Sequence, residues 1–204
     1  IFIAMVLDGL DGRVARLTGT QSEFGAEYDS MSDMVSFGIA PSLIVYEWAL
    51  KEIGQWGWII AFIYCTCAAL RLARFNTNIN VVDKRFFQGL PSPAAAALIA
   101  GLVWVTFNFD IQGTDVRFLA CIVTLFAALS MVSNIPYYSG KEINLRRRVP
   151  FVTILLLVLF FFVLIPSHPP LVLFCLFTAY AFSGYVIKLW RLGRSRKSNE
   201  PSQS

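Results

Sequence analysis

Charged side chains are scarce in this sequence. They make up 15% of its 204 residues, whereas hydrophobic residues make up 56%. Soluble globular domains contain about 25% charged residues, so the composition excludes an ordinary water-soluble protein. The longest polar stretches are under about 20 residues, which is too short for a separate soluble domain. The class that remains is an integral membrane protein.

Cysteine and histidine are also few. The four cysteines, Cys65, Cys67, Cys121 and Cys175, all lie within apolar runs. No histidine accompanies them at the spacing of metal ligands, so they indicate neither a zinc site nor a disulfide framework. The single histidine, His168, stands next to Pro169 and is interpreted as a turn residue. The sequence therefore does not favour chemistry that depends on a cysteine or histidine nucleophile.

Long apolar runs are what the sequence has in abundance. A helix needs about 20 residues to cross a hydrocarbon core of roughly 30 Å. The runs predict one partial span ending near Leu17 and six full spans, at Met34–Leu50, Trp56–Phe75, Pro91–Phe109, Val116–Ile135, Pro150–Pro166 and Pro170–Trp190.

These spans predict an all-α fold, a polytopic transmembrane helix bundle of about seven spans. Its catalytic domain is expected to cover residues 1–194, and residues 195–204 are expected to form a polar, disordered tail. Only seven apolar residues precede Asp8, so we expect the front of the first helix to lie in sequence before residue 1. Pro41 is expected to kink its helix, and Pro91 and Pro93 fit the first turn of theirs.

Basic residues fall in alternate connections between the spans. They are Arg13 and Arg16, then Arg71, Arg74, Lys84 and Arg85, then Lys141 and Arg146 to Arg148, and finally Lys188, Arg191, Arg194, Arg196 and Lys197. The positive-inside rule assigns these connections to the cytoplasmic side. The net charge of +4 thus reflects membrane topology and contact with anionic lipid headgroups, and no nucleic-acid partner is expected.

Four aspartates stand at the ends of the first two apolar runs: Asp8, Asp11, Asp29 and Asp33. Each pair is three or four residues apart, so its members share one face of a helix. Residues 18–20, Thr-Gly-Thr, form a turn signal that would bring the two helices back antiparallel. The four carboxylates are therefore predicted to face one point.

Such a cluster requires cations. Four adjacent negative charges repel one another and take up protons unless positive charge intervenes, and two divalent ions balance a charge of minus four. Ligands that are all oxygen favour Mg²⁺ or Mn²⁺ and are compatible with Ca²⁺. Two such ions commonly stabilise both the attacking and the leaving oxygen in displacement at phosphorus.

The residues around the aspartates complete a longer pattern. Asp8, Asp11, Gly12, Ala15, Arg16, Gly25, Asp29 and Asp33 fill all eight positions of D-x-x-D-G-x-x-A-R-x8-G-x3-D-x3-D. This pattern resembles the signature of the CDP-alcohol phosphatidyltransferases. The resemblance implies that the four aspartates hold two divalent metals and that Asp33 is also the general base. It further implies a CDP pocket lined by Gly12, Ala15, Arg16 and Gly25, and a homodimer with a six-helix core, here with extra C-terminal helices.

A narrower similarity concerns the acceptor. Residues 25–38, 71–76 and 87–94 are similar to membrane-type phosphatidylserine synthases of bacteria. The similarity implies CDP-diacylglycerol as donor and L-serine as acceptor, in a bacterial cytoplasmic membrane with the site facing the cytoplasm. Candidates for holding the acceptor carboxylate or a lipid phosphate are Arg71, Arg74, Asn76 and Lys84, although both arginines also suit simple topological anchors.

Other functions stay open at this point. The acceptor of the same chemistry is alternatively glycerol phosphate or inositol phosphate, and the donor alternatively carries an archaeal-type lipid. A cation transporter is the reading from a different class, because carboxylates within a membrane often mark ion paths. Against transport, the aspartates lie at helix ends on one side and the later spans hold no acidic residue at their middle.

Overall fold

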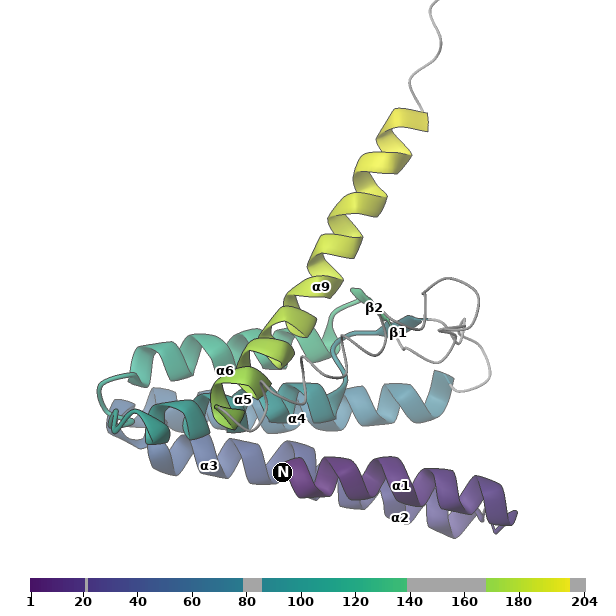
Figure 1. The fold of residues 1–204 in the computed structure, drawn as a ribbon, viewed down its shortest axis with the longest axis horizontal. Helices are drawn as coiled ribbons and strands as arrows, with labels where there is room; N and C mark the ends of the chain where they lie inside the picture. Colours follow the sequence, from purple (N-terminus) through teal and green to yellow (C-terminus); the bar gives the residue numbers. More distant parts are fainter. Residues whose placement is uncertain (21, 79–85, 139–167, 199–204) are drawn as a thin grey trace, which may run out of the picture.

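The computed structural model describes residues 1–20, 22–78, 86–138 and 168–198, which form a bundle of helices (Figure 1). The α-helices are α1 (Phe2–Thr18), α2 (Glu23–Asp33), α3 (Ala40–Trp48), α4 (Gln55–Asn78), α5 (Ser92–Asn108), α6 (Arg117–Val132) and α9 (Pro169–Ser198). A π-helical segment, η1 (Met34–Ile39), joins α2 directly to α3, and a 3-10 segment, η2 (Leu50–Ile53), leads into α4. The predicted mostly helical architecture is confirmed.

The predicted spans that fall within the described residues coincide with helices, and their ends agree to within a few residues except at the end of α9, which runs eight residues beyond Trp190. The predicted span Pro150–Pro166 lies outside the described residues. Helix α9 continues to Ser198, past residue 194, where composition predicts the start of the polar tail. The rest of that tail, residues 199–204, lies outside the described part of the chain.

Within the described residues, two helices are long and apolar enough to cross a membrane, at Gln55–Thr77 and Pro169–Trp190. Helices α5 and α6 are apolar but have only 17 and 16 residues. At 1.5 Å per residue each is about 25 Å long, somewhat less than the hydrocarbon core. Large apolar side chains such as Trp58, Phe62 and Leu129 are exposed on the outside of the bundle. A lipid environment accounts for so apolar an outer surface.

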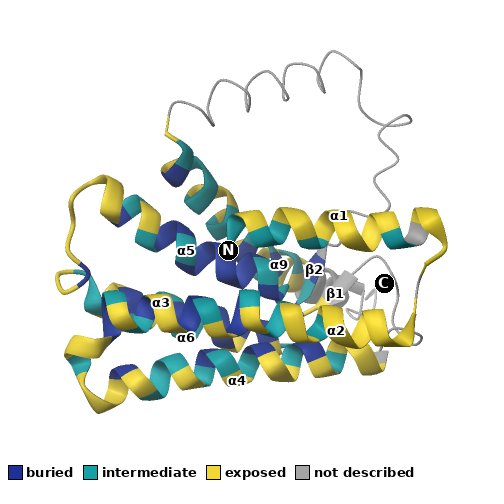
Figure 2. Cartoon of the chain, turned by 90° about the horizontal axis from the view of Figure 1, so that it is seen from below, coloured by how far each residue is buried: buried dark blue, intermediate teal, exposed yellow. Residues whose placement is uncertain are grey.

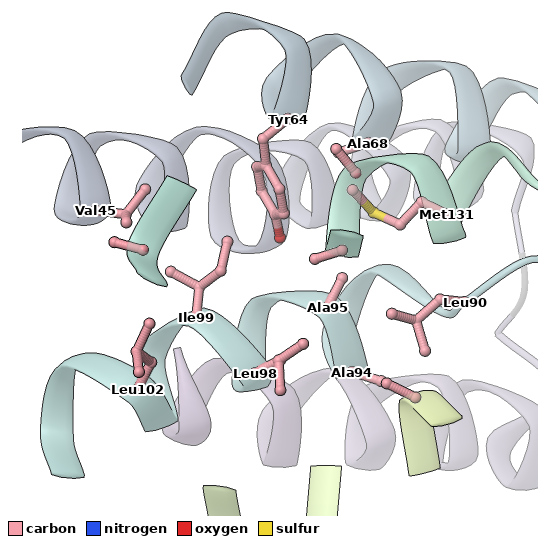
Figure 3. Close-up of a cluster of buried hydrophobic side chains, with 14 of the residues drawn as sticks. Val45, Tyr64, Ala68, Leu90, Ala94, Ala95, Leu98, Ile99, Leu102 and Met131 are labelled. Atoms are coloured by element: carbon pink, nitrogen blue, oxygen red, sulfur yellow. The ribbon is translucent and has the colours of Figure 1, made fainter. Parts of the chain in front are cut away.

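Helix α5 lies at the centre of the bundle. Residues 94–97 are four consecutive alanines, at most 7% exposed, and their small side chains let neighbouring helices approach closely. A Cβ added at Gly101 would lie 3.3 Å from the Cα of Phe174, so α9 packs directly on the α5 backbone. Figure 3 shows Ile99 of α5 in the same buried cluster as Tyr64 of α4.

Helices α1 and α2 run antiparallel as a hairpin on one side of this core, and most of their residues are exposed (Figure 2). The predicted turn closes the hairpin. Gly19 ends α1 in the left-handed conformation, with φ of 67°, which glycine adopts without steric cost. Ser22 then caps α2, because its hydroxyl accepts the backbone N–H of Gly25 at 3.0 Å.

A short antiparallel ribbon joins two distant connections. Strand β1 (Phe86–Gln88) pairs with β2 (Pro136–Tyr138). Gly89 follows β1 with φ of +82°, and a Cβ there would lie 2.2 Å from the carbonyl oxygen of Met131. The sequence analysis does not predict this ribbon, because strands of three residues are too short to show a periodicity.

Candidate active site

Three carboxylates meet between α1 and α2. One oxygen from each of Asp8, Asp11 and Asp29 lies within 4.8 Å of the other two. Asp33, one turn further along α2, interacts electrostatically with Asp8 and Asp29. The antiparallel hairpin therefore brings three of the four carboxylates together and places the fourth beside them, and their roles as metal ligands stay a prediction.

The surroundings of the cluster disfavour the ionised form of its carboxylates. Asp29 and Asp33 precede the apolar segment that begins at Met34, and both have a raised pKa. Partial burial, followed by the charges of Asp8 and Asp29, raises the pKa of Asp33 to about 7. Partial burial, followed by the charge of Asp11, raises the pKa of Asp29. A group of carboxylates in this state binds protons or cations readily.

The donor set fits hard divalent cations. All four side chains offer carboxylate oxygens, the ligands that Mg²⁺ and Mn²⁺ prefer in proteins. Asp11 is oriented by its own helix, because its Oδ1 accepts the backbone N–H of Gly12 at 2.6 Å. Asp8 and Asp33 repel each other when both are ionised, and a cation between them would remove that repulsion.

The small residues predicted to line a CDP pocket border this cluster. A Cβ added at Gly12 would meet no atom within 4 Å, so the space beside this glycine is open. At Gly25 an added Cβ would lie 3.1 Å from the Ser22 hydroxyl that caps α2. Ala15 is partly buried on α1, and the side chain of Arg16 lies outside the described part of the chain. Among these positions, the open space at Gly12 favours close approach of a ligand.

Arg71 is the cation that faces the aspartates from α4. It interacts electrostatically with Asp33 and Asp8, and also with Tyr180 on α9. Its Nη1 donates to the hydroxyl of Ser92 at 2.6 Å, and Ser92 is fully buried at the start of α5. Three helices therefore position this guanidinium beside the carboxylates. Sequence patterns do not point to Ser92 or Tyr180, because neither belongs to a local pattern that includes Arg71.

The other acceptor candidates have different surroundings. Arg74 donates to the Val132 carbonyl at 3.3 Å and to the side-chain oxygens of Gln88 and Asn134, each at 2.5 Å. These bonds fasten α4 to the end of β1 and to the connection between α6 and β2, which favours a structural role for Arg74. Asn76 donates to the hydroxyl of Ser30 on α2, at 2.9 Å. Lys84 lies outside the described residues.

Comparison with known proteins agrees with the geometry. A profile described as CDP-alcohol phosphatidyltransferase matches residues 1–126, which include the complete aspartate pattern. The chain is 40% identical over 163 residues to a Helicobacter pylori protein, covering 79% of this chain and 68% of that one. It is 33% identical over 165 residues to a Mycobacterium leprae protein, covering 78% and 55%. It is 40% identical over 137 residues to a Methanocaldococcus jannaschii protein, covering 67% and 61%.

All three relatives carry the name CDP-diacylglycerol–serine O-phosphatidyltransferase. The family expected from the eight-position pattern is thereby confirmed. Because the profile spans more than half of the sequence and includes all four aspartates, this chain belongs to the CDP-alcohol phosphatidyltransferase family.

Proposed function

We propose that this protein transfers a phosphatidyl group from CDP-diacylglycerol to the hydroxyl of L-serine, forming phosphatidylserine and releasing CMP. The observation that carries the proposal is the convergence of Asp8, Asp11 and Asp29, with Asp33 close enough to interact with Asp8 and Asp29. The names of the relatives supply the donor and the acceptor. Family membership supports transferase chemistry.

The donor binds at the hairpin of α1 and α2. Divalent cations, two in our proposal and either Mg²⁺ or Mn²⁺, would be held by the four aspartates and would neutralise the diphosphate and the charge left on CMP. The open space beside Gly12 lets the diphosphate approach the backbone of α1. Ala15, Arg16 and Gly25 complete the CDP pocket in this proposal, with Arg16 pairing with a phosphate oxygen.

The reaction is a single displacement. Asp33 takes the proton from the serine hydroxyl while that oxygen attacks the lipid-side phosphorus. A new phosphorus–oxygen bond to serine forms, the phosphoanhydride bond to CMP breaks, and CMP leaves with the electron pair. No covalent enzyme intermediate is required, since binding both substrates side by side is sufficient for direct transfer.

Arg71 binds the serine carboxylate in this mechanism. Its guanidinium interacts with Asp33 and is held by the Ser92 hydroxyl, so a carboxylate bound to it would bring the serine hydroxyl toward the general base. Asn76 and Lys84 remain secondary candidates for contact with the acceptor or a lipid phosphate. Arg74 is a weaker candidate, because its donors already engage Gln88, Asn134 and the Val132 carbonyl.

The same proposal places the protein in a bacterial cytoplasmic membrane, with the aspartates facing the cytoplasm. The basic residues on their side of the membrane support this orientation. We further propose about seven spans, made of a six-helix core and extra C-terminal helices, and assembly as a homodimer. The apolar outer surface of α4 and α9 supports contact with lipid.

An acceptor screen tests the function. The purified full chain in detergent is given CDP-diacylglycerol and Mn²⁺ with serine, glycerol 3-phosphate or inositol phosphate, and both CMP and the lipid product are measured. We expect CMP release that depends on serine and yields phosphatidylserine, and no release by an Asp8→Asn variant. Release that depends on another acceptor would overturn the serine assignment. Cation flux through proteoliposomes without any CMP release would favour the transporter instead.

A further inference from the structure

The helix that carries Asp29 and Asp33 contains an irregular turn immediately after Asp33. Residues Glu23–Trp48 form one continuous helical rod, in which η1, the π-helical segment, separates α2 from α3. The backbone N–H of Ala40 bonds to the carbonyl of Val35, five residues earlier, as in a π-helix. Such turns hold an extra residue and occur frequently at functional sites.

Pro41 accounts for this irregularity. In an α-helix the N–H of residue 41 would bond to the carbonyl of Phe37, four residues earlier. Proline has no N–H, and its ring presses against that carbonyl. The Phe37 carbonyl is buried with its residue, which is 1% exposed, so it needs another partner. The widened turn makes room for the proline ring, and a hydrogen-bond donor from elsewhere in the fold binds the Phe37 carbonyl.

Tyr64 on α4 supplies the donor. Its hydroxyl donates to the Phe37 carbonyl at 3.0 Å, and the residue is fully buried. Figure 3 shows the Tyr64 ring directed into the buried cluster. Gly38 lets the π segment pack closely on α4, since a Cβ there would lie 3.2 Å from the Cβ of Ala68. The irregular turn is therefore fixed by specific contacts with α4.

The turn sets the direction of the aspartates relative to the core. One residue of an α-helix corresponds to a rotation of about 100°. If the extra residue of the π segment were lost while Phe37 and α3 kept their places, Asp29 and Asp33 would rotate by about that angle. They would then point away from Asp8 and Asp11, and the cluster would not form.

We infer that Tyr64 is a positioning residue for the cation-binding carboxylates. Its hydroxyl stabilises the π segment that Pro41 imposes and thereby aims Asp29 and Asp33 at α1. The inference rests on the proposed function only in taking the aspartate cluster as a site for divalent cations. It does not depend on which alcohol is the acceptor.

The test is Mn²⁺ binding to the purified full chain in detergent, measured by electron paramagnetic resonance of the free ion, together with the melting temperature. We expect Tyr64→Phe, which keeps the ring and removes the hydroxyl, to weaken Mn²⁺ binding about fivefold, the scale of one lost buried hydrogen bond. Tyr137→Phe is a matched control. Tyr137 is also fully buried and donates to a backbone carbonyl, that of Ala181 at 2.9 Å.

The two variants lose equivalent bonds, so both are expected to melt at a lower temperature, and only Tyr64→Phe is expected to lose Mn²⁺ affinity. Equal losses of affinity would overturn the inference, because they would reflect general destabilisation. Unchanged binding by Tyr64→Phe would overturn it as well. A wild-type chain that binds no Mn²⁺ would instead contradict the cation site itself, and with it the proposed function.

A second arm uses Pro41→Ala, which restores a backbone N–H at residue 41. That N–H can bond to the Phe37 carbonyl, so the Tyr64 hydroxyl should matter less in this background. We expect Tyr64→Phe to change Mn²⁺ affinity less than about twofold when Pro41 is already alanine. A full fivefold effect there would contradict the coupling. If Tyr64→Phe alone fails to fold, Pro41→Ala by itself carries the test: it should weaken Mn²⁺ binding, because the π segment that aims Asp29 and Asp33 is no longer imposed, and unchanged binding would overturn the inference.

Discussion

The side-chain amide of Asn76, near the end of α4, donates to the hydroxyl of Ser30 on α2 at 2.9 Å. Ser30 is the neighbour of Asp29 in the sequence, and no residue of α2 is buried. A helix with so little buried surface depends on a few specific contacts for its place, because burial contributes most of the stability of packed helices. The bond between Asn76 and Ser30 is thus a direct connection between α4 and the aspartates.

This connection predicts coupled effects of substitution. Asn76→Ala and Ser30→Ala are each expected to lower the rate of CMP release about three- to fivefold, as one hydrogen bond to the site is lost. The double variant is expected to be no worse than either single variant, because both remove the same bond. Independent, multiplying effects would show that the two residues act separately, and a change in serine KM for Asn76→Ala alone would support its role at the acceptor.

Gly12 provides a test of the CDP pocket. A Cβ added there meets no atom within 4 Å, and alanine is favoured over glycine within a helix by about 0.5–1 kcal/mol. Gly12→Ala is therefore expected to leave the melting temperature unchanged or to raise it. If the diphosphate approaches α1 at this point, the same variant raises the KM for CDP-diacylglycerol at least about tenfold.

The control for Gly12 is Gly57→Ala. Its Cβ would lie 1.9 Å from the backbone carbonyl oxygen of Leu50, so this change is expected to destabilise the fold. A Gly12→Ala variant with normal KM for the donor would place the diphosphate elsewhere.

The site could be predicted from sequence to the extent that its geometry is local. Asp8 and Asp11 share a helical face, as do Asp29 and Asp33, and the turn at Gly19 brings the pairs together within a single hairpin. The positions of the apolar helices could also be predicted, because a long apolar run is a local feature of the sequence. Pro41 was expected to distort its helix, and the structure shows that the distortion is a π segment.

The rest of the site depends on contacts that no local pattern contains. Arg71 is bonded to Ser92 and lies near Tyr180, which follows it by more than a hundred residues. The hydrogen bond between Tyr64 and Phe37 joins α4 to η1, and both residues lie in apolar runs. Nothing in such a run distinguishes the tyrosine that makes this bond from the other tyrosines. The packing of the bundle decides which of these distant residues come into contact.

Arg71 is expected to contribute to the affinity for serine. Arg71→Lys keeps the charge but loses the planar pair of donors that suits a carboxylate, so the KM for serine should rise about tenfold or more while donor KM stays nearly constant. Arg74→Lys serves as the comparison, because the Arg74 donors engage Gln88, Asn134 and the Val132 carbonyl. That variant is expected to lower the melting temperature with little effect on serine KM. The opposite pattern would assign the acceptor to Arg74.

The raised pKa of Asp33 predicts how proton and cation compete. Its pKa is about 7, above its ordinary value of 3.8, mainly because of burial and then because of the Asp8 and Asp29 charges. In the metal-free protein, the stability associated with its protonated form is present at acid pH and is lost as pH rises through 7. The melting temperature of that protein should thus fall from about pH 4 to about pH 7 and level off above it, while Mn²⁺ affinity rises up to about pH 7 as the competing proton leaves. Asp33→Asn, which cannot titrate, should flatten the pH dependence of both the melting temperature and the Mn²⁺ affinity.

The same pH dependence in the wild type and in Asp33→Asn would assign the titration to another group. Substantial CMP release by this variant, with its metal content retained, would show that Asp33 is not the general base.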